Sequence, residues 1–290
     1  MELRVLNYFL ATAQELNMTR AAEKLLVSQP ALSRQIADLE DELGVKLFIH
    51  KPRQLTLTPA GQYLQEQAKE ILTLSEKTKR NLQSTAIISG DLTIAAGESI
   101  AMQRIVNVMS NIVQDYPTVK LHIAEKRLNT GTVDFAVIIG NLPLNGYASM
   151  QLPEKDTWSV LVASDDPLAK KEHITPNDIV NRQIINSQQA ETYGIFDNWF
   201  GNYKEQVNII GTYNLSYNGT LLVKNHAAIM LTLDKLANTS ADSGLVFIPL
   251  KPAIYQPLNI IWKKETTLSP VAQLFLDRLK ASIMDDVKFD

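Results

Sequence analysis

The spacing of apolar residues changes once along the 290-residue chain, and this change constrains the fold more than any other feature. Up to about residue 83, apolar residues recur every three or four positions, as Leu3, Leu6 and Leu10 do, which predicts helices. From residue 91 onward, short alternating or continuous apolar runs predict strands that are separated by helices. We therefore expect an N-terminal domain made almost wholly of helices, followed by a larger α/β domain with a mostly parallel sheet.

The composition excludes several classes of protein. Hydrophobic residues make up 45% of the chain and charged residues 20%, which are the proportions of a globular protein and not of a disordered one. The absence of cysteine excludes disulfides, thiolate metal sites and cysteine nucleophiles. No apolar run approaches the roughly 20 residues that span a bilayer, and the N-terminus lacks the apolar core of a signal peptide. We expect a cytoplasmic protein without a membrane partner.

Capping and breaking residues set the predicted boundaries. The Thr58-Pro59 pair predicts the start of a long helix, because a capping threonine is followed by a proline in the first turn. The predicted segments are, in order, a helical domain (1–58), a long helix (59–83), a hinge (84–90) and an α/β domain (91–290), whose two lobes cover about 91–142 with 258–290 and about 143–257. We expect a cleft between these lobes.

A predicted helix-turn-helix at about residues 18–37 is the most informative part of the helical domain. Thr19 is placed to cap its first helix, and Ser28 to cap a second helix that ends at Gly44. The second helix would bury its leucine and isoleucine side chains and expose short polar groups and a guanidinium near its start. Two β-prone pieces joined by a basic loop at residues 50–54 then predict a wing.

The polar residues exposed by the second helix have the chemistry that reads a DNA major groove. Arginine can bind guanine O6 and N7, glutamine can pair with adenine, and a helix N-terminus can hold a phosphate. Basic residues of the wing would contact the DNA backbone or minor groove. The residues that this chemistry predicts to contact DNA are Ser28, Gln29, Ser33, Arg34, Lys51 and Arg53.

The charge of the first 60 residues is polarised rather than basic overall. Seven basic side chains (4, 20, 24, 34, 46, 51 and 53) balance seven acidic ones (2, 15, 23, 38, 40, 41 and 42). Residues 40–42 lie at the far end of the second helix, away from its proposed DNA end. The whole chain carries a net charge of −3, so a nucleic-acid site must be local. On these patterns alone, a helical protein-interaction module remains an alternative.

The long helix carries a narrow apolar stripe. Residues 64, 68, 71, 75, 78 and 82 step by 4, 3, 4, 3 and 4, which is a heptad pattern. A helix of this length cannot bury itself on a small domain, so we expect it to pair with a second copy of the chain. The predicted pairing residues are Leu64, Ala68, Ile71 and Leu82. A long helix that lies on the second domain is the alternative.

Several stretches of the first 61 residues recur in one family of proteins: Thr19-Arg20-Ala21-Ala22, 28–33, 39–44, Leu47-Phe48 and 57–61. On these stretches, the N-terminal domain closely resembles the winged helix-turn-helix of LysR-type transcriptional regulators. Residues 91–290 are similar to the effector-binding domain of that family, which resembles type 2 periplasmic binding proteins. This second resemblance depends on Tyr116-Pro117, 131–136 and Leu268-Ser269-Pro270.

The resemblance implies a sequence-specific DNA-binding regulator and not an enzyme. It implies that the recognition helix contacts DNA along residues 28–35, which adds Pro30, Ala31 and Gln35 to the predicted contacts, and we expect Thr19 and Arg20 of the preceding helix to contact DNA as well. It implies an operator with an inverted repeat, a homodimer or homotetramer paired through the long helix, and a small-molecule effector in the cleft. Two departures affect these expectations. His50 stands where the family usually has arginine in the wing, and the chain looks about eight residues short between Val119 and Asp134.

The predicted effector contacts lie at strand ends and helix starts. They are Gly97, Glu98, Ser99, Ile100, Asn141, Asn186, Ser187 and Asn214. Amides and hydroxyls at such positions suit a small polar metabolite, with a carboxylate as one candidate because helix starts favour anions. Glu98 would oppose a second negative charge.

Residue patterns typical of enzymes and metal sites are missing from the sequence. The four histidines have no i, i+4 partner, and there is neither a glycine-rich phosphate loop nor a nucleophile elbow, so we expect no metal and no cofactor. The alternative function is a small-molecule binding protein or enzyme whose helical domain serves only for assembly. A nucleoid-type architectural protein is a weaker alternative, since it would need more positive charge.

Overall fold

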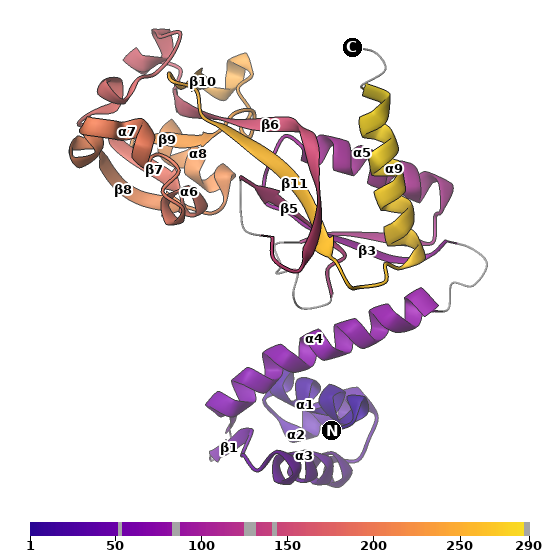
Figure 1. Cartoon of the computed structure of the whole chain (residues 1–290). Coiled ribbons are helices and arrows are strands. Elements are labelled where there is room, and N and C mark those ends of the chain that lie inside the picture. Colours follow the sequence, from indigo (N-terminus) through magenta and orange to yellow (C-terminus); the bar gives the residue numbers. More distant parts are fainter. Residues whose placement is uncertain (52–53, 83–87, 125–131, 141–143, 287–290) are drawn as a thin grey trace. The chain divides into compact units, whose positions relative to one another are not determined.

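A computed structural model describes residues 1–51, 54–82, 88–124, 132–140 and 144–286 (Figure 1). They form two compact units. The helical unit comprises Met1–Asp91 together with residues 118–120 and Thr132, and the α/β unit comprises the rest. The predicted hinge falls mostly on residues 83–87, which lie outside the described residues, and its last residue, Gly90, begins a strand.

The helical unit contains four helices and a two-stranded wing. They are α1 (Leu3–Glu15), α2 (Met18–Leu25), α3 (Gln29–Leu43), β1 (Phe48–Lys51), β2 (Gln54–Leu57) and α4 (Pro59–Leu82). The first three helices pack on one another, and α4 packs against α1. Their shared core contains Phe9, Leu32 and Leu39, and Phe9 lies 5.4 Å from the ring of Phe48 in the wing. The apolar stripes that the sequence predicts therefore meet in one core.

Two details of the predicted helix-turn-helix are wrong. The α2 helix begins at Met18, and Asn17 caps it by accepting a hydrogen bond from the Arg20 amide at 3.1 Å, so Thr19 is not the cap. Ser28 occupies the N-cap position of α3, but its side chain makes no capping hydrogen bond. The bounds predicted for α3 are confirmed, with Gly44 in the left-handed region at its end.

The wing strands lie closer to the wing tip than predicted. His50 pairs with Leu55, and Lys51 pairs with Gln54, so three residues of the expected basic loop belong to strands. Residues 52 and 53 lie outside the described part of the chain. The wing follows directly into α4, where the Thr58 hydroxyl accepts a hydrogen bond from the Gly61 amide at 2.9 Å. This threonine therefore caps the long helix as predicted.

The α4 helix uses part of its apolar stripe within its own unit. Leu64 and Ala68 are buried in the helical core, so they are not available for the pairing that we predicted for them. Ile71 and Leu82 are 37% and 72% exposed. The heptad pattern includes the buried residues as well as the exposed ones, because the apolar stripe that packs on α1 continues along α4 with the same spacing.

The α/β unit contains a nine-stranded sheet with helices around it (Figure 1). Its first elements are β3 (Gly90–Ala95), α5 (Met102–Asp115), β4 (Val119–Ala124), β5 (Phe135–Ile139), β6 (Tyr147–Ala163), β7 (Gln183–Ser187) and α6 (Gln188–Thr192). The others are α7 (Asp197–Phe200), β8 (Asn208–Tyr213), α8 (Ser216–Lys224), β9 (Ile229–Leu233), β10 (Leu245–Pro249), β11 (Tyr255–Lys263) and α9 (Pro270–Asp286). Within the described residues, short 3-10 helices lie at 167–170, 176–179, 201–206 and 241–243.

The sheet is mixed, and the expectation of a mostly parallel sheet is wrong. The strand order is β4-β3-β5-β11-β6-β9-β7-β8, with β10 also paired to β6. Parallel pairing occurs between β3 and β5 and between β7 and its neighbours, whereas β6 and β11 are antiparallel to each other and to the strands beside them. Figure 1 shows β6 and β11 side by side as they run between the two lobes. Both strands therefore belong to both lobes.

The helix predicted at about 192–200 is two short helices. Gly194, between α6 and α7, has a φ of +59°, a conformation that interrupts a right-handed helix. The chain then brings Phe196, Trp199 and Phe200 into the core of the second lobe, where the rings of Trp158 and Phe196 lie 4.9 Å apart. In the first lobe, Phe275 of α9 packs at 5.1 Å from Phe135 of β5.

Candidate functional site

The α3 helix separates an apolar face from a polar one. Leu32, Ile36 and Leu39 are buried in the helical core. The residues predicted to contact DNA lie on the other side: Ser28, Gln29, Pro30, Ala31 and Arg34 are exposed, and Ser33 and Gln35 are half-buried. Packing thus holds the helix by one face and leaves its N-terminal polar groups toward solvent.

The basic residues predicted at this surface differ in their surroundings. Among the residues that the structure describes, Arg34 makes no hydrogen bond or ion pair with the chain. Arg20 is also exposed, but its guanidinium donates a hydrogen bond to the carbonyl of Glu15 at 2.9 Å, which ties it to the end of α1. Arg53 and the side chain of Lys51 lie outside the described residues. Arg34 is therefore the described cation best placed to contact a ligand of the α3 surface.

Glu40 is one of the acidic residues at the C-terminal end of α3, and it makes contacts within the helical unit. Its carboxylate is buried and accepts hydrogen bonds from the amides of Leu47 and Phe48 at 2.8 and 3.1 Å, and it pairs with Lys46 at 2.8 Å. Burial raises the pKa of Glu40, but the hydrogen bonds from Lys46 and the two amides together lower it by more. The pKa of Glu40 is therefore below its ordinary value. This acid joins α3 to the wing.

Acidification is expected to destabilise the helical unit through Glu40. Because its folded-state pKa is below the ordinary 4.5, the carboxylate contributes stability above about pH 4.5, and this contribution is lost as the pH falls through the folded-state pKa. Glu40→Gln should lower stability at neutral pH and flatten the decline at acid pH. Urea unfolding followed by circular dichroism measures both effects, with exposed Glu66→Gln as the matched control. Equal pH dependence in all three proteins would contradict this role.

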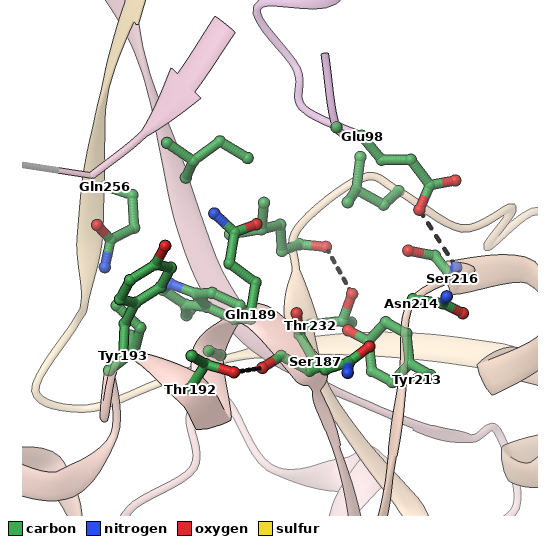
Figure 2. Close-up of a pocket in the computed structure, with 18 residues that line it drawn as sticks. Glu98, Ser187, Gln189, Thr192, Tyr193, Tyr213, Asn214, Ser216, Thr232 and Gln256 are labelled. Atoms are coloured by element: carbon green, nitrogen blue, oxygen red, sulfur yellow. Dashed lines mark hydrogen bonds between the residues drawn. The ribbon is translucent and has the colours of Figure 1, made fainter. Parts of the chain in front are cut away.

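A pocket of about 590 Å³ lies between the two lobes of the α/β unit. Figure 2 shows Gln256 and Tyr193 on the left and Glu98 on the right, next to Ser216 at the start of α8, with Ser187 of β7 and Thr232 of β9 between them. Its lining joins the loop after β3, the end of β5, Trp158 of β6, the β7–α6 junction, the β8–α8 loop, the end of β9 and the start of β11. Parallel strands β7 and β8 end at this cavity, which is the usual position of a ligand site in such sheets.

Only some of the predicted effector contacts line this pocket. Gly97, Glu98, Ser187 and Asn214 line it. Ser99, Ile100 and Asn186 do not, and we withdraw them as contacts. Asn141 lies outside the described residues, as do the positions next to the apparent eight-residue gap.

The withdrawn residues are used in the lobes themselves. Asn186 is buried, and its amide nitrogen donates to a carboxylate oxygen of Glu191 at 2.8 Å. Ser99 is buried beside Asp156, which accepts a hydrogen bond from the Ile100 amide at 3.1 Å. Burial raises the pKa of Asp156, against smaller lowering effects of the hydrogen bonds from Ser99 and Ile100. These groups hold the start of α5 to β6.

Sequence reasoning missed most of the pocket. The additional lining residues include Ile139, Trp158, Gln188, Gln189, Thr192, Tyr193, Tyr213, Ser216, Thr232 and Gln256. The missed positions come mainly from β6, β9 and β11 and from the α6 turn, whose spatial neighbours no local pattern specifies. Tyr213 donates a hydrogen bond to the Leu231 carbonyl at 2.9 Å, and burial, with the charge of Glu98, raises the pKa of its hydroxyl.

The described residues contain neither a cluster of three or more potential metal ligands nor a helix long and apolar enough to cross a membrane. The pocket lining is a mixture of amides, hydroxyls and aromatic rings, with Glu98 as its one charged side chain among the described residues. Such a lining can orient a small polar molecule by hydrogen bonds.

Two family models match the chain. Residues 3–62 match the bacterial regulatory helix-turn-helix protein of the lysR family, and residues 87–283 match the LysR substrate binding domain. The second match alone covers more than half of the chain. The chain belongs to the LysR family of transcriptional regulators.

This LysR-family regulator is similar to characterised and uncharacterised members. It is 27% identical to the uncharacterized HTH-type transcriptional regulator YbhD of Escherichia coli K12, over 98% of this chain and 93% of YbhD. It is 31% identical to the Hca operon transcriptional activator HcaR of the same organism, over 72% of this chain and 74% of HcaR. Structures of CbnR, alone and with its target DNA, give a TM-score of 0.75 at 21% and 20% identity. These matches cover 98% and 97% of this chain and 99% and 100% of CbnR.

The family assignment confirms the predicted resemblance, the fold class and the general function. The protein is a DNA-binding transcriptional regulator with an effector-binding domain, and its family consists of regulators and not of enzymes. The alternative of an enzyme or binding protein whose N-terminal domain serves only for assembly is therefore set aside.

Proposed function

We propose that the regulator reads its operator with the exposed face of α3, and that its activity responds to a small polar molecule in the pocket of the α/β unit. The observation that carries the proposal is the division of α3 into a buried apolar face and a polar face with exposed Gln29 and Arg34 and half-buried Ser33. Side chains of this kind form hydrogen bonds with base edges in the major groove. Ser28 and the N-terminus of α3 are suited to a phosphate.

The regulator acts as a homo-oligomer in the cytoplasm, where its DNA is found. Apolar side chains on the outer part of α4, Ile71, Leu74 and Leu82, are 37%, 39% and 72% exposed and support pairing of two copies through this helix. A two-fold pair of α3 helices reads an operator with an inverted repeat, since operator symmetry follows protein symmetry. These residues replace Leu64 and Ala68 in the proposed contact.

The effector changes DNA binding by preferring one arrangement of the two lobes. A ligand that bridges the loop after β3 and the loop before α8 stabilises one degree of lobe closure more than another. If the two lobe arrangements differ in their affinity for the operator, then binding of the effector changes operator affinity by the same coupling free energy. The polar, partly aromatic lining of the pocket supports a small metabolite as this ligand.

Selection of DNA from the encoding genome tests the DNA part of the proposal. Fragments retained by the purified protein are sequenced, and a shared motif is then titrated as an intact inverted repeat, as a single half-site and as a scrambled duplex. The intact repeat should bind at least about 10³-fold more tightly than the scrambled duplex. Equal affinities with the same steep salt dependence would show binding through phosphates alone.

A further inference from the structure

The N-terminus of α8 has no capping side chain from its own segment. Leu215 occupies the N-cap position and offers no side-chain acceptor. The Ser216 amide instead donates to Oε2 of Glu98 at 3.2 Å, although Glu98 lies 118 positions earlier, in the loop after β3 (Figure 2). The first amides of a helix need acceptors, and the helix dipole favours a negative one. Glu98 thus supplies this acceptor from the other lobe.

This contact lies at the pocket. Both Glu98 and Ser216 line the cavity, so the carboxylate occupies the place in the cleft where a helix start would attract an anionic ligand. A second carboxylate or phosphate there would face the charge of Glu98 at close range. The described part of the pocket lining offers no lysine, arginine or histidine to offset this repulsion.

The remaining lining indicates which groups a ligand would need. Trp158 lines the pocket with only 5% of its surface exposed, and its indole Nε1 has no hydrogen-bond partner among the described residues. That nitrogen is itself buried within the protein, so the indole contributes an apolar contact to the pocket and no accessible donor. Amides and hydroxyls from residues 187, 188, 189, 214 and 256 add neutral donors and acceptors.

We propose that Glu98 is a built-in anion that caps α8 across the cleft, and that the pocket therefore takes a polar effector without net negative charge, rather than a carboxylate or a phosphate. This ligand class rests on the proposed function of the pocket as the effector site. The effector offers a donor to Glu98, as an ammonium or hydroxyl group does.

Acetate rescue tests the capping role without knowledge of the effector. Glu98→Ala leaves a space at the α8 N-terminus that acetate can fill, whereas Glu98→Gln keeps the space filled. Melting temperatures are measured for these variants, the wild type and Glu205→Ala, a loss of an exposed acid outside the pocket. Each protein is tested in sodium acetate, sodium chloride and ethylammonium chloride at equal ionic strength.

We expect acetate to raise the melting temperature of Glu98→Ala by roughly 2–4 °C more than that of the other three proteins. Ethylammonium has a similar shape and the opposite charge, and it should produce no such rise. Equal acetate effects in Glu98→Ala and wild type would overturn the proposal. They would mean either that the α8 N-terminus is already accessible to acetate in the wild type, or that an anion at this position does not contribute to stability.

A thermal-shift screen of metabolites on the wild type tests the ligand class. Stabilisation by uncharged or cationic polar compounds, lost in Glu98→Ala and kept in Glu205→Ala, supports it. Stabilisation by a carboxylate or phosphate that Glu98→Ala preserves or strengthens overturns it. If no compound stabilises the wild type, the sensing function itself fails, and the acetate experiment still decides whether Glu98 caps α8.

Discussion

Arg34→Ala is expected to lower affinity for the operator about 10- to 100-fold for each subunit and to relax the choice of base at one position of each half-site. Arg34 is exposed on the polar face of α3 and has no partner of its own among the described residues, so its guanidinium is available to a base edge. A bidentate contact of arginine with guanine contributes about 1–3 kcal/mol of discrimination, which gives this range.

Fluorescence anisotropy with the selected operator and its single-base variants measures this effect. The matched control is Arg4→Ala. The side chain of Arg4 is 66% exposed on α1, and its substitution removes the same charge from the same unit. The control should bind nearly as well as the wild type and keep the base preference. If Arg34→Ala weakened binding to all sequences equally, then Arg34 would contact phosphate and not a base.

Gly61→Ala is expected to destabilise the helical unit by about 2–3 kcal/mol and to abolish DNA binding near physiological temperature. A Cβ atom at Gly61 would lie 2.2 Å from the Leu47 carbonyl oxygen and 2.9 Å from Cδ2 of Leu57. The Leu47 backbone cannot move freely, because its amide donates to Glu40 and its carbonyl accepts from Thr58. The gain of about 1 kcal/mol in helix propensity for alanine is too small to offset this clash.

Hydrogen–deuterium exchange with urea unfolding measures this change and locates it. Exchange should rise in peptides from residues 1–82 and stay the same in peptides from residues 144–286. Gly211→Ala is the matched control, since a Cβ there would meet no atom within 4 Å. Unchanged exchange in Gly61→Ala would mean that the wing and α4 can separate without cost, which would contradict the packing described above.

The predictions that succeeded concern short stretches with strong local signals. The bounds of α3 and the start of α4 agree with the structure because a cap, a proline and a glycine lie next to a 3.6-residue apolar pattern. The cap of α2 was misassigned by two residues, since both Asn17 and Thr19 are good N-cap residues. The proposed DNA contacts lie on helix α3 itself, so the same pattern that predicts its buried face predicts its exposed one.

The sequence predicts strands at 159–163 and 258–262, which lie within β6 and β11, but it does not predict the first part of β6, from Tyr147 to Trp158. The notable apolar runs within them, 159–163 and 258–262, cover only the parts that are buried, while the polar middle of β6 around residues 153–157 reads as a loop. Antiparallel pairing of the two strands keeps that polar stretch extended. Strand pairing depends on a partner about 100 residues away, which no local pattern contains.

The chain's own periodicity and capping residues are enough to predict two domains and the helix that we propose reads DNA, and its short motifs indicate the family, because each of these depends on residues close to one another in the sequence. The pocket depends on seven segments that meet only after the sheet has formed. The tertiary structure therefore decides which polar residues face the cleft. The side chains of Ser99 and Asn186 are buried, whereas Glu98 lies at the start of α8. The free energy of burying a side chain depends on contacts with strands that are distant in the sequence. It therefore distinguishes polar residues that have the same local sequence pattern.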